Sequence, residues 1–210
     1  MIYLIKRKGE NKIKINRLSP DIYEIEDFVT VSEQEDILNF CKKLEEDQWW
    51  IVPSYDKTYK EGFFYGKQYN GDKPLVFKDI ETRMNSLFNS NSYFSDLALQ
   101  RYKKDESIEA HRDYWIYDLD YHMRYGICIY YNDDYEGGEL DYPDLGITYK
   151  PKARSLVMHG GNITHQSLPV SNDALRYFST SFVRGSKDNP VILNKKLFDG
   201  IEEHDGSEYK

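Results

Sequence analysis

The 210 residues are enough for one domain with a sizeable hydrophobic core, and no Gly-, Pro- and Ser-rich linker or internal repeat divides them. Hydrophobic residues make up 40% and aromatic residues 15% of the chain, with 19 Tyr, which is typical of a globular protein and excludes a disordered one. The net charge of −8 argues against a nucleic-acid partner, because phosphate-binding proteins usually carry a basic face, although a local basic patch could survive within it.

The cysteines and the N-terminal segment indicate in which cellular compartment the protein is expected. Cys41 and Cys128 are too few and too far apart for a disulfide framework, which favours a reducing environment. The N-terminal apolar run is too short for a signal peptide, and its charges follow the run instead of preceding it. No segment approaches the length of a membrane span. We therefore expect a soluble, cytoplasmic protein with no membrane partner.

The first part of the chain predicts one strand and two helices. Residues 22–29 contain β-branched and aromatic residues in partial alternation, which predicts a strand. A capping-box pattern at 32–35, with Ser at the N-cap and Glu at N3, predicts a helix through about Asp47. The apolar spacing predicts a second helix over about 74–88, with Pro in its first turn. Residues 49–72 lack a clean period, so we expect a long excursion with some strand content.

After residue 95, short apolar runs separated by Gly, Pro, Asn and Asp turn signals follow one another. Strands are predicted at 96–103, 108–114, 123–131, 138–142, 146–150, 154–158, 163–169 and 175–184. This spacing is typical of an antiparallel sandwich or jelly roll. We expect a single domain over 1–210, in which 1–94 provides helical and strand support, 95–185 forms the core, and the polar tail 186–210 docks on the domain or frays.

A His-x-Asp pair, His111 and Asp113, falls within one predicted strand. Because a strand places residues i and i+2 on the same face, both side chains can point at one metal ion. Two histidines and one carboxylate leave open positions on a metal for a co-substrate and oxygen, and His165 is our candidate for the third ligand. Arg176, on the next predicted strand, carries a guanidinium that can bind a carboxylate bidentately. Each feature alone is common, and His-x-Asp by itself is more often a surface hydrogen-bonded pair; their order and setting make the pattern specific.

The stretch from 99 to 184 resembles the prolyl 4-hydroxylase-like branch of the iron(II)- and 2-oxoglutarate-dependent oxygenase superfamily. The motifs that carry the resemblance are Leu99-Gln100-Arg101-Tyr102, Ala110-His111-Arg112-Asp113-Tyr114, the run from Ile129 to Leu140 that contains Gly137-Gly138, Pro151-Lys152-Ala153-Arg154-Ser155-Leu156, His165-Gln166-Ser167-Leu168-Pro169-Val170 and Leu175-Arg176-Tyr177. The resemblance implies a mainly β fold with N-terminal α-helices, built on a double-stranded β-helix, which is a distorted jelly roll. The whole chain would then be one 2-oxoglutarate/iron oxygenase domain.

The resemblance also implies roles for individual residues. It implies that Fe(II) is bound by His111, Asp113 and His165. It implies that the distal carboxylate of 2-oxoglutarate is bound by Arg176 and Tyr130, and that ascorbate serves as a reductant. Tyr102 would line the pocket and Leu140 would pack against the methylenes of the co-substrate, although core packing explains these two residues equally well.

Two further residues need interpretation: His159, which differs from the residue that most of the family carries, and Cys128, whose orientation the sequence leaves undecided. Many members of the family carry Phe or Leu where this chain has His159, so His159 competes with His165 for the third ligand position. A pocket-side or core histidine satisfied by a neighbour is the favoured interpretation of His159. Cys128 shares its strand parity with Tyr130, so it either faces the pocket or is a small buried residue.

The activity implied by the resemblance is hydroxylation of a prolyl residue in a peptide or protein, with release of succinate and CO2. Aromatic clusters at 49–50, 59–71 and 114–125 either form a rim on which a peptide packs or cover the outside of the core. The same chemistry on a free amino acid, another small molecule or a nucleobase is the alternative. A metal-binding jelly roll without turnover is a third hypothesis, which the three ligands together with Arg176 argue against.

Overall fold

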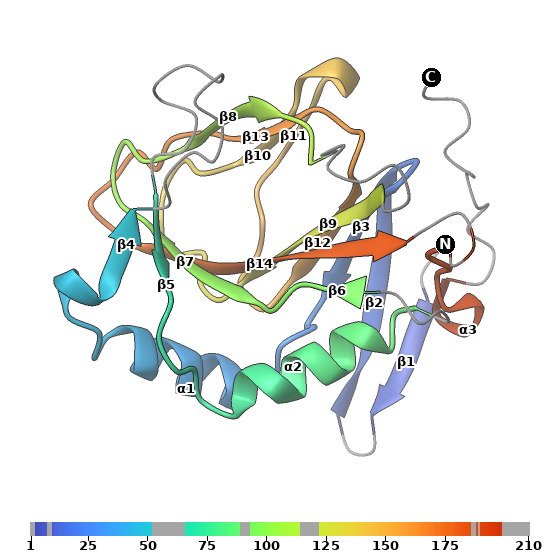
Figure 1. Cartoon of the computed structure of the whole chain (residues 1–210), viewed down its shortest axis with the longest axis horizontal. Helices are drawn as coiled ribbons and strands as arrows, with labels where there is room; N and C mark the ends of the chain where they lie inside the picture. The colour runs from blue at the N-terminus through green and yellow to red at the C-terminus, as the bar shows by residue number, and fades with distance from the viewer. Residues whose placement is uncertain are drawn as a thin grey trace.

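The computed structural model describes residues 3–7, 10–51, 66–88, 93–113, 122–185, 188 and 190–198. Most of them belong to two antiparallel sheets that face each other (Figure 1). The large sheet has ten strands, in the spatial order β1 (Tyr3–Arg7), β2 (Glu10–Ser19), β3 (Ile22–Glu26), β12 (Leu156–Gly160), β9 (His122–Tyr130), β14 (Arg176–Gly185), β7 (Ala98–Tyr102), β5 (Lys67–Tyr69) and β4 (Trp49–Ile51), with β6 (Tyr93–Phe94) paired to β14. The small sheet has four strands, in the order β11 (Ile147–Tyr149), β10 (Leu140–Tyr142), β13 (His165–Ser167) and β8 (Ile108–His111).

The chain crosses repeatedly between the two sheets from β7 onwards. Strands β7, β9, β12 and β14 lie in the large sheet, and the strands between them in the sequence lie in the small one. This alternation is the winding of a double-stranded β-helix, so the predicted mainly β fold with N-terminal helices is confirmed. All eight strand runs predicted after residue 95 contain a strand.

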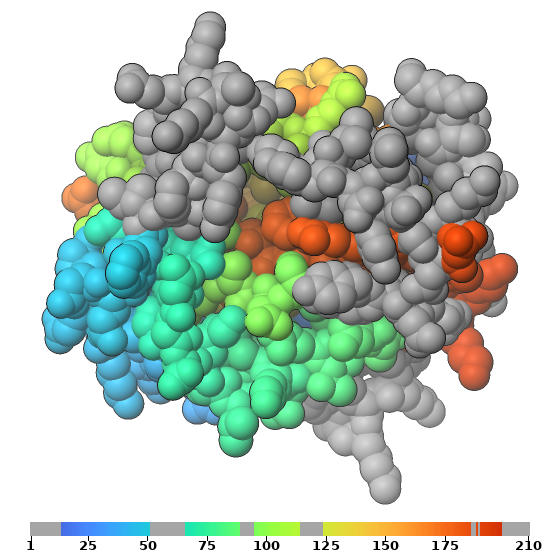
Figure 2. Space-filling model, viewed as in Figure 1, coloured from blue at the N-terminus to red at the C-terminus, as the bar shows by residue number. Residues whose placement is uncertain are grey.

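Two helices, α1 (Val31–Cys41) and α2 (Val76–Asn85), cover the outer face of the large sheet, opposite the small sheet (Figure 1). In the space-filling view, the green atoms around α2 and the red-orange atoms of β14 form neighbouring bands of the same face (Figure 2). Ile37 of α1 and Ile80 and Met84 of α2 are fully buried against the sheet. A second buried cluster, which includes Tyr130 and Leu140, fills the space between the sheets. The sheets and helices thus sandwich two apolar layers, and the inner layer surrounds the site described below.

The predicted bounds of both helices need correction. The N-cap of α1 is Thr30, whose hydroxyl accepts a hydrogen bond from the Glu33 N–H at 3.2 Å, while the Glu33 carboxylate accepts from the Thr30 N–H at 2.8 Å. The predicted capping box at 32–35 is therefore two residues late: Thr30-Val31-Ser32-Glu33 fits the same sequence pattern, and Glu33 also pairs with Arg83 of α2. Helix α1 ends at Cys41 and a short 3₁₀ helix, Glu46–Gln48, follows where the prediction continued the helix to Asp47. Helix α2 is shorter than the predicted 74–88 at both ends.

The N-terminal hairpin of β1 and β2 was not predicted from the sequence. Strand β2 pairs antiparallel with β3, with Ile15 opposite Ile25, and so extends the large sheet. Ile15 is fully buried, and residues 12–16, Lys-Ile-Lys-Ile-Asn, alternate between polar and apolar, a strand signal that the sequence analysis did not use. Pairing with β3 then completes the backbone hydrogen bonds of β2.

Part of the C-terminal tail docks on the domain. The short helix α3 (Lys195–Phe198) buries Phe198, whose ring packs edge-on against Tyr23 with the ring centroids 5.5 Å apart. Leu193 forms an isolated bridge with Phe88, at the end of the α2 region. The docking predicted as one alternative therefore occurs over 190–198, and residues 199–210 lie outside the described part. No described helix has the length and apolar character needed to span a membrane.

The predicted aromatic rim lies mostly outside the described residues, which omit 52–65 and 114–121. Trp49 is buried and packs against Tyr69 and Tyr177, so it covers the core. Trp50 is 62% exposed. Among the described aromatic residues of the predicted rim, Trp49 and Tyr125 are buried in the core, Tyr69 packs against it, and Trp50 is exposed.

Candidate active site

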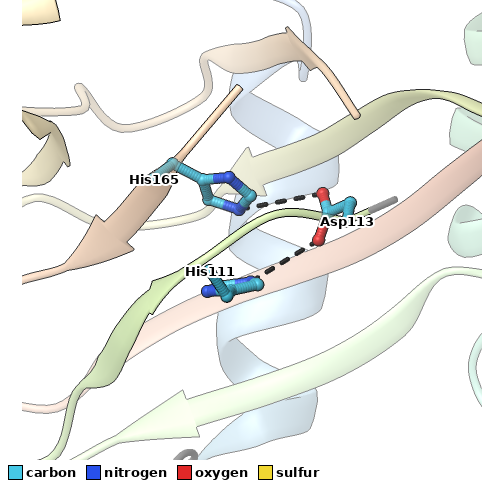
Figure 3. A group of neighbouring side chains, drawn as sticks. All are labelled: His111, Asp113 and His165. Atoms are coloured by element: carbon cyan, nitrogen blue, oxygen red, sulfur yellow. Dashed lines mark ion pairs between the residues drawn. The ribbon is translucent and has the colours of Figure 1, made fainter. Parts of the chain in front are cut away.

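Two neighbouring strands of the small sheet, β8 and β13, and the turn after β8 bring His111, Asp113 and His165 together (Figure 3). His111 ends β8 and His165 begins β13, and the two histidines face each other in register across these paired strands. Their ring centroids lie 4.3 Å apart. Asp113 follows two residues after His111, beyond the end of β8, so the prediction that both belong to one strand is wrong. One ligand atom from each of the three side chains lies within 4.8 Å of the others, which suits a single metal ion.

The backbone orients both imidazoles so that their Nε2 atoms face Asp113. The Nδ1 atom of His111 lies 2.7 Å from the Glu109 carbonyl oxygen, and that of His165 lies 3.0 Å from the Ile163 carbonyl oxygen. A carbonyl only accepts, so each Nδ1 carries the proton and each Nε2 presents a lone pair. The His111 Nε2 lies 3.5 Å from the Asp113 Oδ1, and the His165 Nε2 lies 3.7 Å from the Asp113 Oδ2. These are the tautomers that metal ligation requires.

The charge state of the site also suits a cation. Burial by itself would raise the pKa of the Asp113 carboxyl, but the imidazoles of His165, His111 and His159 around it hold that pKa well below its usual range. Burial, with His159 beside it, lowers the pKa of His165 to about 3, although Asp113 opposes the shift. At neutral pH the group is therefore an ionised carboxylate beside a neutral His165 imidazole, which is the protonation state of metal ligands.

Arg176 is a buried cation without an acidic partner among the described residues. It begins β14, is 1% exposed, and pairs in register with Tyr102. Its guanidinium donates to the Ser167 hydroxyl and, at 3.4 Å, to the Tyr130 hydroxyl, while its Nε is buried without a hydrogen-bond partner. Aromatic rings surround it, with the centroid of Phe178 4.6 Å from the guanidinium carbon. Because burial of an unpaired ion costs several kcal/mol, this arrangement favours an anionic ligand.

One cavity of about 310 Å³ joins the three candidate metal ligands to Arg176. Every residue singled out from the sequence for a role lines this cavity: Tyr102, His111, Asp113, Tyr130, Leu140, His165 and Arg176. Cys128 lines it too, and burial raises the pKa of its thiol to about 12, so it is a neutral part of the wall. A volume of this size suits a small ligand together with one side chain of a larger molecule.

The sequence analysis missed several residues of the cavity wall. Ser167 accepts from Arg176, and a polar row on neighbouring strands consists of Gln68, Gln100 and Thr180. Strand parity offered a signal for two of them, since Gln100 lies two residues before Tyr102 and Thr180 four residues after Arg176. Gln68 lies in the segment 49–72, which has no periodic pattern, so the sequence did not indicate that its side chain faces the cavity.

The winding of the strands defines a double-stranded β-helix, and the His-Asp-His group on its small sheet is a candidate set of metal ligands. A scan of protein-family models finds no match, and neither does a search of curated proteins. Solved structures with the same fold include a viral collagen prolyl hydroxylase from Paramecium Bursaria Chlorella virus-1, in complex with 2-oxoglutarate, at 18% identity and a TM-score of 0.61 over 79% of this chain and 97% of that one.

Two cellular proteins show the same likeness. A Pseudomonas putida prolyl-4-hydroxylase matches at 16% identity with a TM-score of 0.59, covering 79% of this chain and 93% of that chain. A Trichoplax adhaerens prolyl hydroxylase, in complex with a peptide fragment of the hypoxia inducible factor oxygen degradation domain, matches at 14% identity with a TM-score of 0.61, covering 88% and 89%. At these identities the likeness establishes the fold, which is the one expected from the sequence motifs.

Proposed function

We propose that this protein is an Fe(II)- and 2-oxoglutarate-dependent dioxygenase. One observation carries the proposal: a single cavity contains both a two-histidine, one-carboxylate group and a buried arginine that lacks an acidic partner among the described residues. The first feature suits a divalent metal with open coordination positions, and the second suits a carboxylate at a distance from that metal. A dicarboxylate that chelates the metal with its other end satisfies both at once.

The residues present fit these two groups. Fe(II) would be held by the Nε2 atoms of His111 and His165 and by Asp113. The distal carboxylate of 2-oxoglutarate would be held by Arg176, whose buried Nε gains a nearby anion, and by the Tyr130 hydroxyl. Ascorbate would serve only to keep the iron reduced.

The wall around the methylene groups would be apolar. Leu140 and Tyr102 are fully buried and belong to the apolar cluster between the sheets. They would pack along the co-substrate and keep water from the site, since neither presents a charge to it. Burial raises the pKa of Tyr102 far above its usual value, so its phenol stays protonated.

When bound, iron would activate O2, which is the oxidant: one oxygen atom would enter 2-oxoglutarate, which becomes succinate and CO2, and the other would enter a substrate C–H bond to give an alcohol. The contribution of the chain is to bind, orient and shield. The backbone carbonyls of Glu109 and Ile163 keep both imidazoles in the required tautomer. Asp113 stays ionised at neutral pH, since the pKa of its carboxyl lies well below its usual range.

For the substrate we propose a prolyl residue within a peptide or protein. Among the described residues that line the cavity, Asp113 and Arg176 are the only acidic or basic side chains apart from histidines. The ammonium and carboxylate of a free amino acid, or the phosphate of a nucleotide, would therefore be desolvated without a counter-charge. A peptidyl proline is neutral, and the polar row of Gln68, Gln100 and Thr180 can meet peptide groups beside it. The prolyl hydroxylases among the structural neighbours support the same choice.

The dioxygenase class is tested by anaerobic titration of the protein with Fe(II) and 2-oxoglutarate. We expect the weak visible charge-transfer band of the iron–keto-acid chelate, and Asp113→Ala should abolish it. Asp141→Ala provides a matched control, because Asp141 is a carboxylate of the small sheet that binds Thr148 and Gln166 and does not line the cavity. A folded wild-type protein without the band would refute the proposal.

The substrate is tested by succinate release under air with three sets of compounds: proline-containing peptides, free amino acids and oligonucleotides. We expect stimulation by peptides alone, with a product heavier by one oxygen atom at proline. Stimulation by a free amino acid or an oligonucleotide instead would preserve the dioxygenase class and overturn the peptide substrate.

A further inference from the structure

His159 lies inside the candidate metal centre although it is not one of its three ligands. It belongs to β12, where Leu156 and Met158 face the helices and the intervening Val157 packs between the sheets. His159 lies two residues after Val157 and therefore on the same face of the sheet, and it is 1% exposed. Its Nε2 lies 3.3 Å from the Asp113 Oδ2, and its ring centroid lies 3.9 Å from that of His165. The side chain thus contacts two of the three proposed ligands.

The hydrogen-bond partners of His159 define its tautomer. The Tyr142 hydroxyl lies 3.3 Å from the His159 Nδ1, and Tyr142 is fully buried on β10 of the small sheet. The ionised Asp113 carboxylate only accepts, so the His159 Nε2 carries a proton and donates it to Oδ2. The Nδ1 of the neutral ring then accepts from the Tyr142 hydroxyl. Tyr142, His159 and Asp113 form one directed chain of hydrogen bonds from the small sheet through the large sheet to the ligand.

The backbone of β9 leaves room for this contact. Gly126 pairs with His159 across the sheet. A Cβ atom at Gly126 would lie 2.1 Å from the Asp113 Oδ2 and 2.7 Å from the His159 Nε2. Both separations are far below van der Waals contact, so any side chain here would push the two groups apart. The glycine is required at the place where Asp113 and His159 meet.

We propose that His159 is a positioning residue that holds Oδ2 of Asp113 and leaves Oδ1 to the metal. This proposal rests on the proposed function for the identity of the ligands. Asp113 follows the end of β8, so no strand hydrogen bond fixes its backbone, and an anchor on its second oxygen limits rotation of the carboxylate. Partners of this kind around metal ligands typically contribute about 10–100-fold to metal affinity.

The test measures binding of Mn(II) alone, by the loss of the electron paramagnetic resonance signal of the free ion, and needs neither co-substrate nor turnover. His159→Phe removes the donor and keeps a planar ring, and we expect it to weaken Mn(II) binding about 10–100-fold. His159→Gln restores an N–H donor and should recover most of the affinity. Met158→Leu, on the same strand but facing the helices, controls for repacking of β12 and should bind as the wild type does.

Several results would overturn this role. Equal Mn(II) affinity of wild type and His159→Phe would show that the contact does not position Asp113. Loss of binding in His159→Phe as complete as in Asp113→Ala would make His159 a ligand instead of a positioning residue. A larger loss in Tyr142→Phe than in His159→Phe would place the effect in Tyr142. If wild-type protein itself fails to bind Mn(II), the metal centre and hence the proposed function fails.

Discussion

Arg176 is the residue at which a substitution should remove ligand binding and leave the stability of the free protein nearly unchanged. Its guanidinium is fully buried and has no acidic partner among the described residues, so in the free protein its desolvation is offset only by hydrogen bonds to two hydroxyls and by aromatic rings. Arg176→Met keeps a long apolar side chain in the same space. It removes a desolvation cost of several kcal/mol and loses two charge-assisted hydrogen bonds of about 1.5–3 kcal/mol each. These contributions are of similar size, so we expect the free variant to be about as stable as the wild type.

The same change should remove most of the affinity for 2-oxoglutarate. Two charge-assisted hydrogen bonds at about 1.5–3 kcal/mol each amount to about 3–6 kcal/mol, which is roughly a 10²–10⁴-fold loss of affinity. At a ligand concentration about 100 times the wild-type Kd, binding stabilises the wild type by about 2.7 kcal/mol, which corresponds to a rise in Tm of about 5–10 °C for a domain of this size. The variant should show almost none of this rise.

The assay is thermal unfolding in saturating Mn(II), with and without 2-oxoglutarate. Pyruvate is the matched ligand, because it has the keto-acid group but no distal carboxylate, and its effect should be the same in both proteins. Arg101→Met is the matched variant: Arg101 is 4% exposed on the adjacent strand but already pairs with Glu46 at 3.0 Å. It should keep the full response to 2-oxoglutarate. An unchanged response in Arg176→Met, or a free variant several kcal/mol less stable than the wild type, would refute the reasoning.

Three further perturbations test other parts of the structure. Gly126→Ala should displace the Asp113 carboxylate and lower Mn(II) affinity at least about 10-fold by paramagnetic resonance, and equal affinity would contradict the close approach at this glycine. Burial raises the pKa of Glu33, but the bonds from Arg83 and the Thr30 N–H outweigh it and lower the folded-state pKa below 4.5, so this stabilisation is present above that pH and is lost as the pH falls. Glu33→Gln should accordingly flatten the acid side of the Tm–pH profile, and an unchanged profile would exclude the pair as its source. Phe198→Ala should cost about 3 kcal/mol, or about 6–12 °C in Tm, and an unaltered Tm would mean that the tail does not dock in solution.

Much of the candidate site could be predicted because its signals are local. His111, Asp113, His165 and Arg176 fall in short, clearly bounded motifs, and the structure places all four around one cavity. The strand parity that joined the first two was nevertheless the wrong reason, since β8 ends at His111 and Asp113 reaches the site from the turn beyond it. The structural roles of these residues stay predictions until metal and co-substrate binding are measured.

Other features depend on partners that are distant in sequence. Glu33 of the capping box also binds Arg83 of α2, a contact that a capping pattern read from four residues cannot include. The hairpin of β1 and β2 extends the large sheet because β2 pairs with β3, and the alternation within β2 does not identify that partner. Ser167 becomes a neighbour of Arg176 only when the small sheet folds over the large one.

The sequence by itself determined the strands and the chemical character of the site. Alternation between apolar and polar residues follows from the geometry of a single strand, and residue type decides which groups can bind a metal or a carboxylate. Only the tertiary structure decided that His111 and His165 form the proposed ligand group with Asp113 and that His159 lies beside Asp113 as its proposed anchor. That difference depends on the register between β8 and β13 and on the contact between Tyr142 and His159, because these partners are distant in sequence.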